Sequence, residues 1–511
     1  MRKHQQRQIL ELLKMINDAQ AEGQYADCQE GAIGIGEFIE QIEGEGTQTV
    51  ALLEKYCELL FKASIGEVSD TRLDRQLGRI ENSIKTELKP NRIEIAFLSY
   101  KASMSDSLES IYFAAKEDPD CDAYWIPIPY YDRKPDRSFG EMHYEGSECY
   151  SDKFDCTDWQ EYDIEARHPD AIFTFNPYDA GNLVTSVHPD FYCERLQKLT
   201  DLLVYVPYFV SGVGVAEHYC MLAGCVFANM VILQSKSIRD TFVSVNENAY
   251  GNRYGNPEEK FVALGSPKFD KVINAKRDDF VLPKEWAKLI TGKKVVLYNT
   301  SIGPTLKGDE KYLAKLRYVI DSFKNLDDVI LWWRPHPLQE VTYESMRPQL
   351  LVKYKKIVAD YKQANLGIYD NTTDSNRAII WTDLYYGDSS SLLVLYLIAG
   401  KPAILQDIDV LSDLNIVNTA TDEVSKAIEH ISSERKRLAR EKELLIKEFA
   451  PMESESYGLK TVISALVNAT DGLCLDAESL KEFRSMFLAS SDGTAGEKVY
   501  FAVRNEIQGK Q

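Results

Sequence analysis

The stretch from Asn376 to Gln406 constrains the fold of this chain more than any other. An apolar segment from Asp383 to Tyr386 leads into the polar turn 387–391, and an apolar run without proline or glycine follows as far as Ala399. Gly-Lys-Pro at 400–402 then ends that run. The pattern predicts a strand, a polar turn, a helix and a second buried strand, in that order.

The polar turn has the chemistry of an anion site. Ser390 or Ser391 is a suitable N-cap, and the helix would direct unpaired backbone N–H groups and its positive dipole end at the turn. Such a turn, with hydroxyl donors beside it, can hold a phosphate. An ordinary capped helix in an α/β sheet has the same pattern, so both interpretations stay open on this stretch alone.

Length and charge limit the class of protein. A chain of 511 residues exceeds what one hydrophobic core usually serves, which predicts two to four domains. With 59 basic and 79 acidic side chains the net charge is -20, which argues against nucleic acid as a partner. A small anionic ligand in a local basic pocket remains compatible with that charge.

The location expected from the sequence is the cytoplasm. Residues 1–9 are polar and basic, and the longest apolar run, Cys220 to Leu233, is too short to span a bilayer. Nine scattered cysteines without a CxxC pair suit a reducing compartment better than a disulfide framework or a zinc site.

Residues 1–90 are expected to form a separate helical arm. Gly-Glu-Gly at 44–46 interrupts the pattern, which predicts an antiparallel helical hairpin or a small bundle. The arm could serve oligomerisation or partner docking, or pack against its own chain, because amphipathic spacing does not identify what covers the apolar face. The apolar positions at helical spacing are Ile9, Leu12, Leu13, Ile16, Val50, Leu52, Leu53, Tyr56, Leu59 and Leu60.

Residues 91–260 are expected to form a first α/β domain. A strand at Ile93–Ser99, a helix at 105–116 and a strand at Tyr124–Ile128 have the order of a βαβ unit. An insert rich in Asp, Tyr and Cys occupies 130–163. Strands alternating with helices imply a parallel sheet. The further predicted strands are Ala171–Phe175, Asp201–Val206 and Val231–Gln234.

Residues 261–410 are expected to form a second α/β domain. Its predicted strands are Val295–Tyr298, Val329–Trp333 and Leu366–Tyr369, followed by the strand before the serine turn. Small polar and histidine-containing loops after successive parallel strands converge on one crevice. The remaining segment, 411–511, is predicted to be mostly helical, with Arg435–Lys447 a solvated helix face.

Four motifs in order carry a family resemblance. They are GSPKFD at 265–270, NTS at 299–301, RPHP at 334–337 and TDLYYGDSSSLLVLYLIAGKP at 382–402. Together they resemble the C-terminal half of the CDP-glycerol glycerophosphotransferase family, the teichoic-acid polymerases and primases. The resemblance covers 261–406, with a looser similarity over 93–210.

The resemblance implies a fold and a site. The fold would be α/β of the GT-B type, in which two Rossmann-type domains with parallel sheets face each other and a CDP-alcohol donor binds mainly on the second. Ser390 and Ser391 would match the serines that contact the donor phosphates, and His336 the histidine of the Pro-His-Pro loop. Such donors stabilise charge that builds on a leaving nucleotide. The other donor-site candidates are Asp388, Ser389, Arg334, Asn299, Thr300, Ser301, Gly265 and Lys268.

Two departures from the family pattern concern the acceptor side. The family's His-Gly-x-Pro motif, proposed to supply the base that activates the acceptor hydroxyl, is replaced here by Tyr205–Val210. The Asp that usually follows four residues after the second serine is Leu395 here. His218 is the nearest substitute base by position, although a lone histidine is more often structural.

The resulting hypothesis is a bacterial enzyme of cell-wall, teichoic-acid or capsule biogenesis. It would move a glycerol-phosphate-type group from a CDP-linked donor to a hydroxyl of a glycan or polyol-phosphate acceptor, releasing CMP. A membrane-anchored acceptor would bring the protein to the inner face of the membrane, and the arm is a candidate contact for a homo-oligomer. The alternatives are a GT-B glycosyltransferase using a nucleotide sugar and a catalytically weak nucleotide-binding scaffold.

No cofactor and no metal are expected. Asp-x-Asp occurs at 118–120 and 407–409, outside the candidate phosphate loops. Transferases of the resembled type generally use side chains and a helix dipole in place of a metal.

Overall fold

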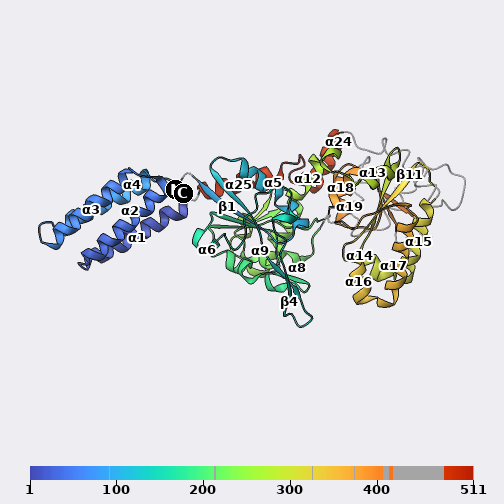
Figure 1. Cartoon of the computed structure of the whole chain (residues 1–511), viewed down its shortest axis with the longest axis horizontal. Coiled ribbons are helices and arrows are strands. Elements are labelled where there is room, and N and C mark those ends of the chain that lie inside the picture. Colours follow the sequence, from blue (N-terminus) through green and yellow to red (C-terminus); the bar gives the residue numbers. More distant parts are fainter. Residues whose placement is uncertain are drawn as a thin grey trace.

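A computed structural model describes residues 1–90, 92–211, 214–324, 326–372, 374–406, 414–417 and 477–509. A helical arm, a first α/β domain and a second α/β domain follow one another along the long axis of the molecule (Figure 1). The predicted helix at 435–447 and the Asp-x-Asp at 407–409 lie outside the described residues. Within the described part of the chain no helix is both long and apolar enough to cross a membrane.

The N-terminal arm is a bundle of four helices. Gly44 and Gly46, both with positive φ, separate the second helix from the third. Most of the predicted apolar positions are buried between the helices, whereas Leu12 is 46% exposed. The helices are α1 Lys3–Ala21, α2 Tyr25–Glu43, α3 Gln48–Ser64 and α4 Asp70–Thr86.

The start of α1 holds the arm against the first α/β domain. Arg2 Nη1 donates to Glu94 Oε2 at 2.6 Å, and Arg7 forms a two-pronged ion pair with Asp201. The ring of His4 stacks on His168 with centroids 4.2 Å apart. The arm therefore packs on its own chain, as one of the two interpretations expected.

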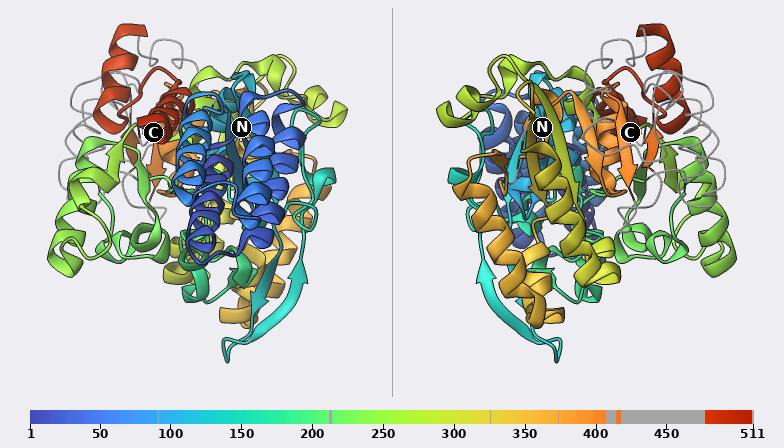
Figure 2. Two further views of the ribbon diagram at one scale, coloured as in Figure 1. Left: turned by 90° about the vertical axis from the view of Figure 1, so that its left-hand side faces the viewer. Right: turned by 90° about the vertical axis from the view of Figure 1, so that its right-hand side faces the viewer.

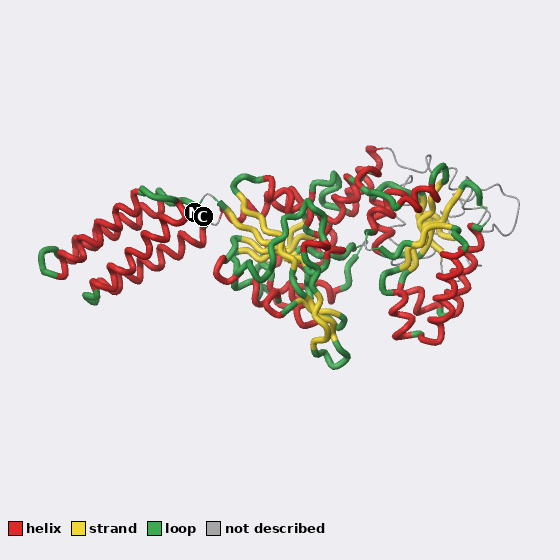
Figure 3. Tube along the Cα trace, in the orientation of Figure 1, coloured by secondary structure: helices red, strands yellow, loops and turns green. Residues whose placement is uncertain are grey.

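The first α/β domain is built on a six-stranded sheet in the order β2-β1-β5-β7-β8-β9, with all neighbours parallel. All seven residues of β1 are buried, as expected for a strand covered on both faces. Figure 3 shows helices around this sheet. The strands are β1 Ile93–Ser99, β2 Cys121–Pro127, β5 Ala171–Thr174, β7 Leu202–Tyr205, β8 Met230–Leu233 and β9 Phe261–Ala263. The helices are α5 Glu109–Glu117, α6 Ile164–Arg167, α7 Cys193–Leu196, α8 Glu217–Cys220, α9 Ala223–Phe227, α10 Lys236–Tyr250 and α11 Pro257–Lys260.

The insert after β2 contributes to a small antiparallel sheet of its own. Strands β3 (Tyr130–Arg133), β4 (Phe139–His143) and β6 (Thr185–Val187) pair in the order β4-β3-β6. The β3–β4 hairpin extends beyond the rest of the chain, as the end views show (Figure 2).

The second α/β domain has the strand order β12-β11-β10-β13-β14-β15, with only β15 antiparallel. Successive residues of β10 and β11 enter different cores, Leu297 and Trp332 on one face and Tyr298 and Trp333 on the other. The sheet is therefore buried on both faces. The strands are β10 Lys294–Thr300, β11 Val329–Pro335, β12 Gly367–Tyr369, β13 Leu384–Gly387, β14 Ala403–Gln406 and β15 Leu414–Val417. The helices are α13 Lys284–Ile290, α14 Ile302–Gly308, α15 Glu310–Phe323, α16 Gln339–Met346, α17 Pro348–Gln363, α18 Ser375–Trp381 and α19 Ser391–Ile398.

The strand order of this sheet is that of the Rossmann fold, because β10, its first strand along the chain, lies beside β13, its fourth. The predicted α/β class, with an N-terminal helical region and two domains built on parallel sheets, is confirmed. Three further helices connect the domains. Helix α12 (Pro267–Asn274) lies between them, α24 (Ala477–Phe487) packs on the second, and α25 (Ala495–Gly509) returns to the first.

Candidate active site at the second sheet

The predicted polar loops meet at the point where the second sheet reverses its strand order. Strand β10 lies between β11 and β13, and Asn299 at its end is level with Arg334 on one side and Gly387 on the other. Chain order runs outward from β10 in both directions. The loops after β10 and β13 contact each other there, Asn299 Nδ2 with Ser390 Oγ at 2.9 Å and Ser301 N with Asp388 Oδ2 at 2.8 Å. Ligands of open α/β sheets bind at such points, outside the carboxyl ends of the strands.

Ser390 lies at this point of the sheet, and its hydroxyl does not cap its own helix. It is the N-cap of α19, yet its side chain makes no capping hydrogen bond. Instead Oγ accepts from Asn299 Nδ2 at 2.9 Å. Tyr385 lies 3.5 Å from the same oxygen, but its own hydroxyl proton goes to the backbone oxygen of Asp388. Ser390 is therefore the donor in its long contact with Tyr385, and a ligand oxygen at the start of the helix would compete with Tyr385 for that proton.

Asp388 shapes the turn. Its carboxylate accepts from Ser301 N at 2.8 Å and from the Tyr312 hydroxyl at 2.6 Å, and it pairs with Lys315 Nζ at 2.9 Å. The side chains of Asp388 and Lys315 are 2% and 1% exposed. The ion pair neutralises the carboxylate, so an anion can approach the turn without facing a net negative charge.

His336 lies at the end of β11 and is tied to the end of β10. Its backbone N–H donates to Thr300 O at 2.9 Å, and its ring Nδ1 accepts from Leu338 N at 3.1 Å. A neutral ring with Nδ1 as acceptor carries its proton on Nε2. Desolvation by the surrounding protein lowers the pKa of His336, which favours this neutral ring. The side chain is exposed, so Nε2 can donate to a ligand.

Thr300 and Gln339 lock the loop after β10 onto the start of α16. Thr300 Oγ1 donates to Gln339 Oε1 at 2.7 Å, and Gln339 Nε2 donates to Thr305 Oγ1 at 2.9 Å. Both Thr300 and Gln339 are buried. Thr300 is therefore a buried support of the loop after β10. Ser389 and Ser391, on either side of Ser390, are exposed.

Arg334 is directed away from the serine turn. Its Nη1 donates to the buried Asp370 at 2.7 Å and its Nη2 to Thr372 O at 2.8 Å, and the side chain is 7% exposed. The guanidinium fixes the loop after β12. The positive charge of Arg334 is paired with Asp370, so we assign Arg334 a structural role beside the site.

Three predicted residues lie apart from this group. Lys268, at the start of α12, pairs with Asp106 of the first domain at 2.6 Å. Gly265 has φ of +98°, and a Cβ there would meet Ser490 Cβ at 2.9 Å. His218 is exposed on α8 of the first domain, its ring 4.1 Å from that of Tyr219.

The segment that replaces the family's His-Gly-x-Pro motif begins at Tyr205, the last residue of β7. Tyr205 is fully buried, and the Tyr208 hydroxyl lies 3.0 Å from that of Tyr178. Burial raises the pKa of both Tyr205 and Tyr208 far above the ordinary value, so neither is a base near neutral pH. The described part of this segment holds hydroxyl donors in place of an imidazole.

Several residues that organise the site were not predicted. Lys315 and Tyr312 reach Asp388 from a helix more than seventy positions earlier in the chain. In sequence they belong to an amphipathic helix, and no local pattern links them to the serine turn. The sequence did not mark Tyr385 as a site residue because it belongs to an apolar strand. Gln339 and Asp370 occur in polar stretches that resemble many others in the chain.

The fold and site together define a class of protein: an α/β protein with two parallel-sheet domains and a serine turn at the strand-order reversal of the second. Residues 232–412 match the model of the CDP-glycerol:poly(glycerophosphate) glycerophosphotransferase family. The predicted family resemblance is thereby confirmed for these residues. A comparison with curated protein sequences finds no match.

The solved structures that are similar to this protein in backbone arrangement have low sequence identity to it. The wall teichoic acid polymerase TagF is 12% identical, with a TM-score of 0.42 over 91% of this chain and 99% of that one. A putative UDP-N-acetylglucosamine 2-epimerase from Listeria monocytogenes is 13% identical, with a TM-score of 0.45 over 82% of this chain and 98% of that one. The assignment above therefore rests on the family match and the strand order.

Proposed function

We propose that this protein transfers a glycerol-phosphate-type group from a CDP-alcohol such as CDP-glycerol to a hydroxyl of a cell-wall, teichoic-acid or capsular glycan. The observation that carries the proposal is Ser390. Its hydroxyl is not used for capping, and it stands at the strand-order reversal of the domain that matches the glycerophosphotransferase family. That position suits a diphosphate.

In the proposed reaction, the acceptor hydroxyl oxygen bonds to the phosphorus that carries the alcohol. The bond from that phosphorus to the bridging oxygen breaks, and CMP leaves with the electron pair. Negative charge grows on the phosphate oxygens in the transition state. Ser390 Oγ, the first N–H groups of α19 and His336 Nε2 would donate to them, which lowers the barrier where donors are fixed in advance.

The proton of the acceptor hydroxyl needs a base. His218 is our candidate, because it is an exposed imidazole on the first domain, whose segment after β7 offers tyrosines instead. A membrane-anchored glycan or polyol-phosphate acceptor would bring a cytoplasmic protein to the inner face of the membrane. A second copy of the chain could bind through the arm.

A thermal-shift panel of nucleotides tests the donor. CDP and CMP should raise the melting temperature more than UDP or GDP. A ligand at about 100 times its dissociation constant stabilises the native state by about 2.7 kcal/mol, well within the resolution of the method. A panel in which UDP-sugars give the largest shift would replace this proposal with a sugar transferase. One in which no nucleotide shifts the melt would point to a scaffold.

A further inference from the structure

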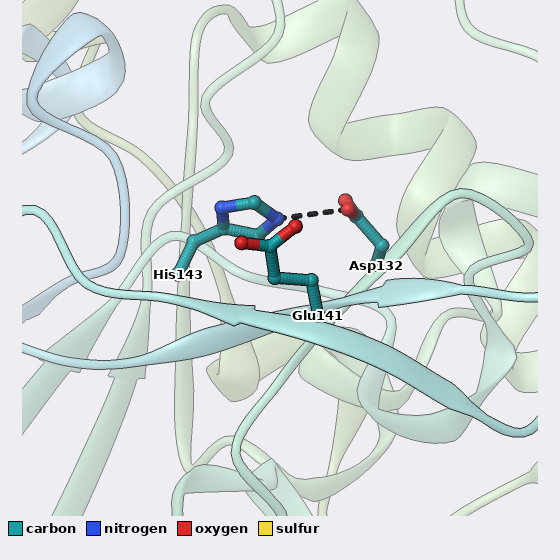
Figure 4. Close-up of side chains that lie close together, drawn as sticks. All are labelled: Asp132, Glu141 and His143. Carbon is teal, nitrogen blue, oxygen red and sulfur yellow. Dashed lines mark hydrogen bonds and ion pairs between the residues drawn. The ribbon is translucent and has the colours of Figure 1, made fainter.

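Three metal-ligating side chains meet on the β3–β4 hairpin of the first domain, outside the proposed phosphate site. They are Asp132 from β3 and Glu141 and His143 from β4, all drawn in Figure 4. One ligand atom from each lies within 4.8 Å of the other two. His143 Nε2 is 2.8 Å from Asp132 Oδ2.

The strand register explains the convergence. Tyr131 pairs with Met142 and Arg133 with Phe139, so Asp132 alone is opposite the two residues Gly140 and Glu141. This is a β-bulge, a feature that re-aims side chains on the longer strand. Glu141 and His143 are two residues apart and share one face of β4. The bulge brings that face toward Asp132.

The local backbone favours this packing. A Cβ at position 140 would meet Asp132 Cβ and Asp132 O, both at 3.2 Å, so glycine permits the close approach of the two strands. The ring of Tyr130 stacks against that of His143, with centroids 5.1 Å apart and planes 27° from parallel. The imidazole is thus oriented by its neighbours on a paired strand, a more exact support for ligands than a loop.

The two carboxylates of the cluster are not in direct contact with a lysine or arginine within the described residues. Two carboxylates this close repel each other. Among the described residues neither Asp132 nor Glu141 forms an ion pair with a lysine or arginine, and the Asp132 carboxylate contacts the imidazole of His143. Lys101 Nζ lies 4.8 Å from the Tyr130 ring centroid, and Arg133 Nη1 donates to Arg137 O. A divalent cation among the three ligands would offset the repulsion.

We propose that Asp132, Glu141 and His143 bind a first-row divalent cation. Two carboxylate oxygens and one imidazole nitrogen form a three-ligand set that leaves coordination positions open to solvent. Imidazole favours zinc-type and related transition cations, whereas Mg²⁺ and Ca²⁺ prefer all-oxygen sites. The site would bind Mn²⁺ or Zn²⁺ more tightly than Mg²⁺ or Ca²⁺, and would join the two strands of the hairpin.

Mn²⁺ is the probe for the test, because zinc would also bind thiolates and Cys149 is exposed. The full chain is freed of metal with EDTA, exchanged into clean buffer and titrated with Mn²⁺ while EPR measures the free ion. We expect one bound equivalent, and a ¹⁴N modulation in the pulsed EPR spectrum from the His143 imidazole. Mg²⁺ in the same concentration range should not displace it.

Single substitutions identify the ligands. His143→Gln should abolish the ¹⁴N modulation, and Glu141→Gln or Asp132→Asn should weaken Mn²⁺ binding about tenfold or more, at least as much as losing an outer-shell partner does. His188→Gln is the matched control. His188 is a half-buried histidine 3.5 Å from the Asp190 carboxylate, outside the three-ligand cluster. That variant should keep both the affinity and the ¹⁴N signal.

Two results would overturn the proposal. One is wild-type protein that binds no Mn²⁺ below about 1 mM, the weak end of protein divalent-cation sites. The other is a bound Mn²⁺ whose affinity and ¹⁴N signal persist in all three ligand variants. Melting temperatures close to wild type would show that the variants are folded, as expected for substitutions at the surface.

Discussion

At the scale of single residues, neighbouring side chains in the serine turn have different tasks. Asp388 is buried and engaged with Ser301, Tyr312 and Lys315, so it holds the turn in shape. Ser390 accepts one hydrogen bond from Asn299 and is the donor in a long, 3.5 Å contact with Tyr385 that a ligand oxygen could replace. The turn therefore separates the group that builds the site from the group that meets the ligand.

Replacing Ser390 and Ser391 together by alanine should weaken CDP binding while the protein stays folded. Hydrogen bonds to a charged phosphate contribute about 1.5–3 kcal/mol each, so the dissociation constant should rise tenfold or more. The fold should change little, because the Ser390 side chain does not cap its helix. Calorimetric titration with CDP and a urea melt measure the two effects.

Asp388→Asn in the same turn is the contrasting variant. It removes the Asp388 charge from its buried pair with Lys315, and breaking a buried pair costs about 3–5 kcal/mol. That variant should unfold at much lower urea. A serine double variant that melts far below wild type and still binds CDP normally would show that the serines serve only the helix.

At the scale of secondary-structure elements, the docking of α1 depends on groups that titrate. His4 stacks on His168, which in turn lies 3.3 Å from Asp201, while Arg2 and Arg7 bind Glu94 and Asp201. Burial first, then the charges of His168 and Arg7, lower the pKa of His4 from 6.5 to about 4. The docked arm therefore requires a neutral His4.

The stability of the docked arm should fall in mild acid. Because the pKa of His4 is lower in the folded protein, unfolding takes up a proton below pH 6.5. The contribution of neutral His4 to the free energy of unfolding is present in full above pH 6.5 and is lost as the pH falls through about 4. His4→Phe keeps the stacked ring and removes the titration. The melting temperatures of wild type and His4→Phe should converge or cross between pH 6.5 and 4. A difference between them that stays constant over this range would contradict the role assigned to His4.

Elements with strong periodicity were predicted well from the sequence, and those fixed by distant contacts were not. The strands that lead into Asn299, Arg334 and Gly387 were predicted within a few residues, because buried parallel strands are short apolar runs. Strand β9 was missed, since a run of three residues is too short to show a periodic pattern. The closeness of the loops that carry Asn299, His336 and Ser390 could be predicted from the order of the strands. The ion pair between Lys315 and Asp388 could not.

At the scale of the whole molecule, the GSPKFD segment joins the two α/β domains. Lys268 and Lys271 of α12 pair with Asp106 and Glu109 of the first domain. Asp270 accepts from Ala495 N at 3.0 Å and Gly496 N at 2.8 Å, at the start of α25. The apolar side chains of α25 then complete the core of the first domain.

Asp270→Ala should loosen α25. The two backbone N–H groups would lose their acceptor in a buried place, at about 1–3 kcal/mol each. The melting temperature should fall, and limited proteolysis should cut at α25 sooner. Asp492→Ala removes an exposed carboxylate paired with Lys498 near the same helix and should cost less than about 1 kcal/mol. Equal effects of the two substitutions would contradict the proposed junction.

The most direct test of the account is the release of CMP from CDP-glycerol in the presence of an isolated wall or capsule glycan. Wild-type protein should release CMP and extend the acceptor. His336→Ala should lose most of the turnover with little change in melting temperature, because the imidazole is exposed and acts on charge that develops in the transition state. Wild-type protein that consumes a UDP-sugar but not CDP-glycerol, or a His336→Ala variant with wild-type turnover, would contradict it.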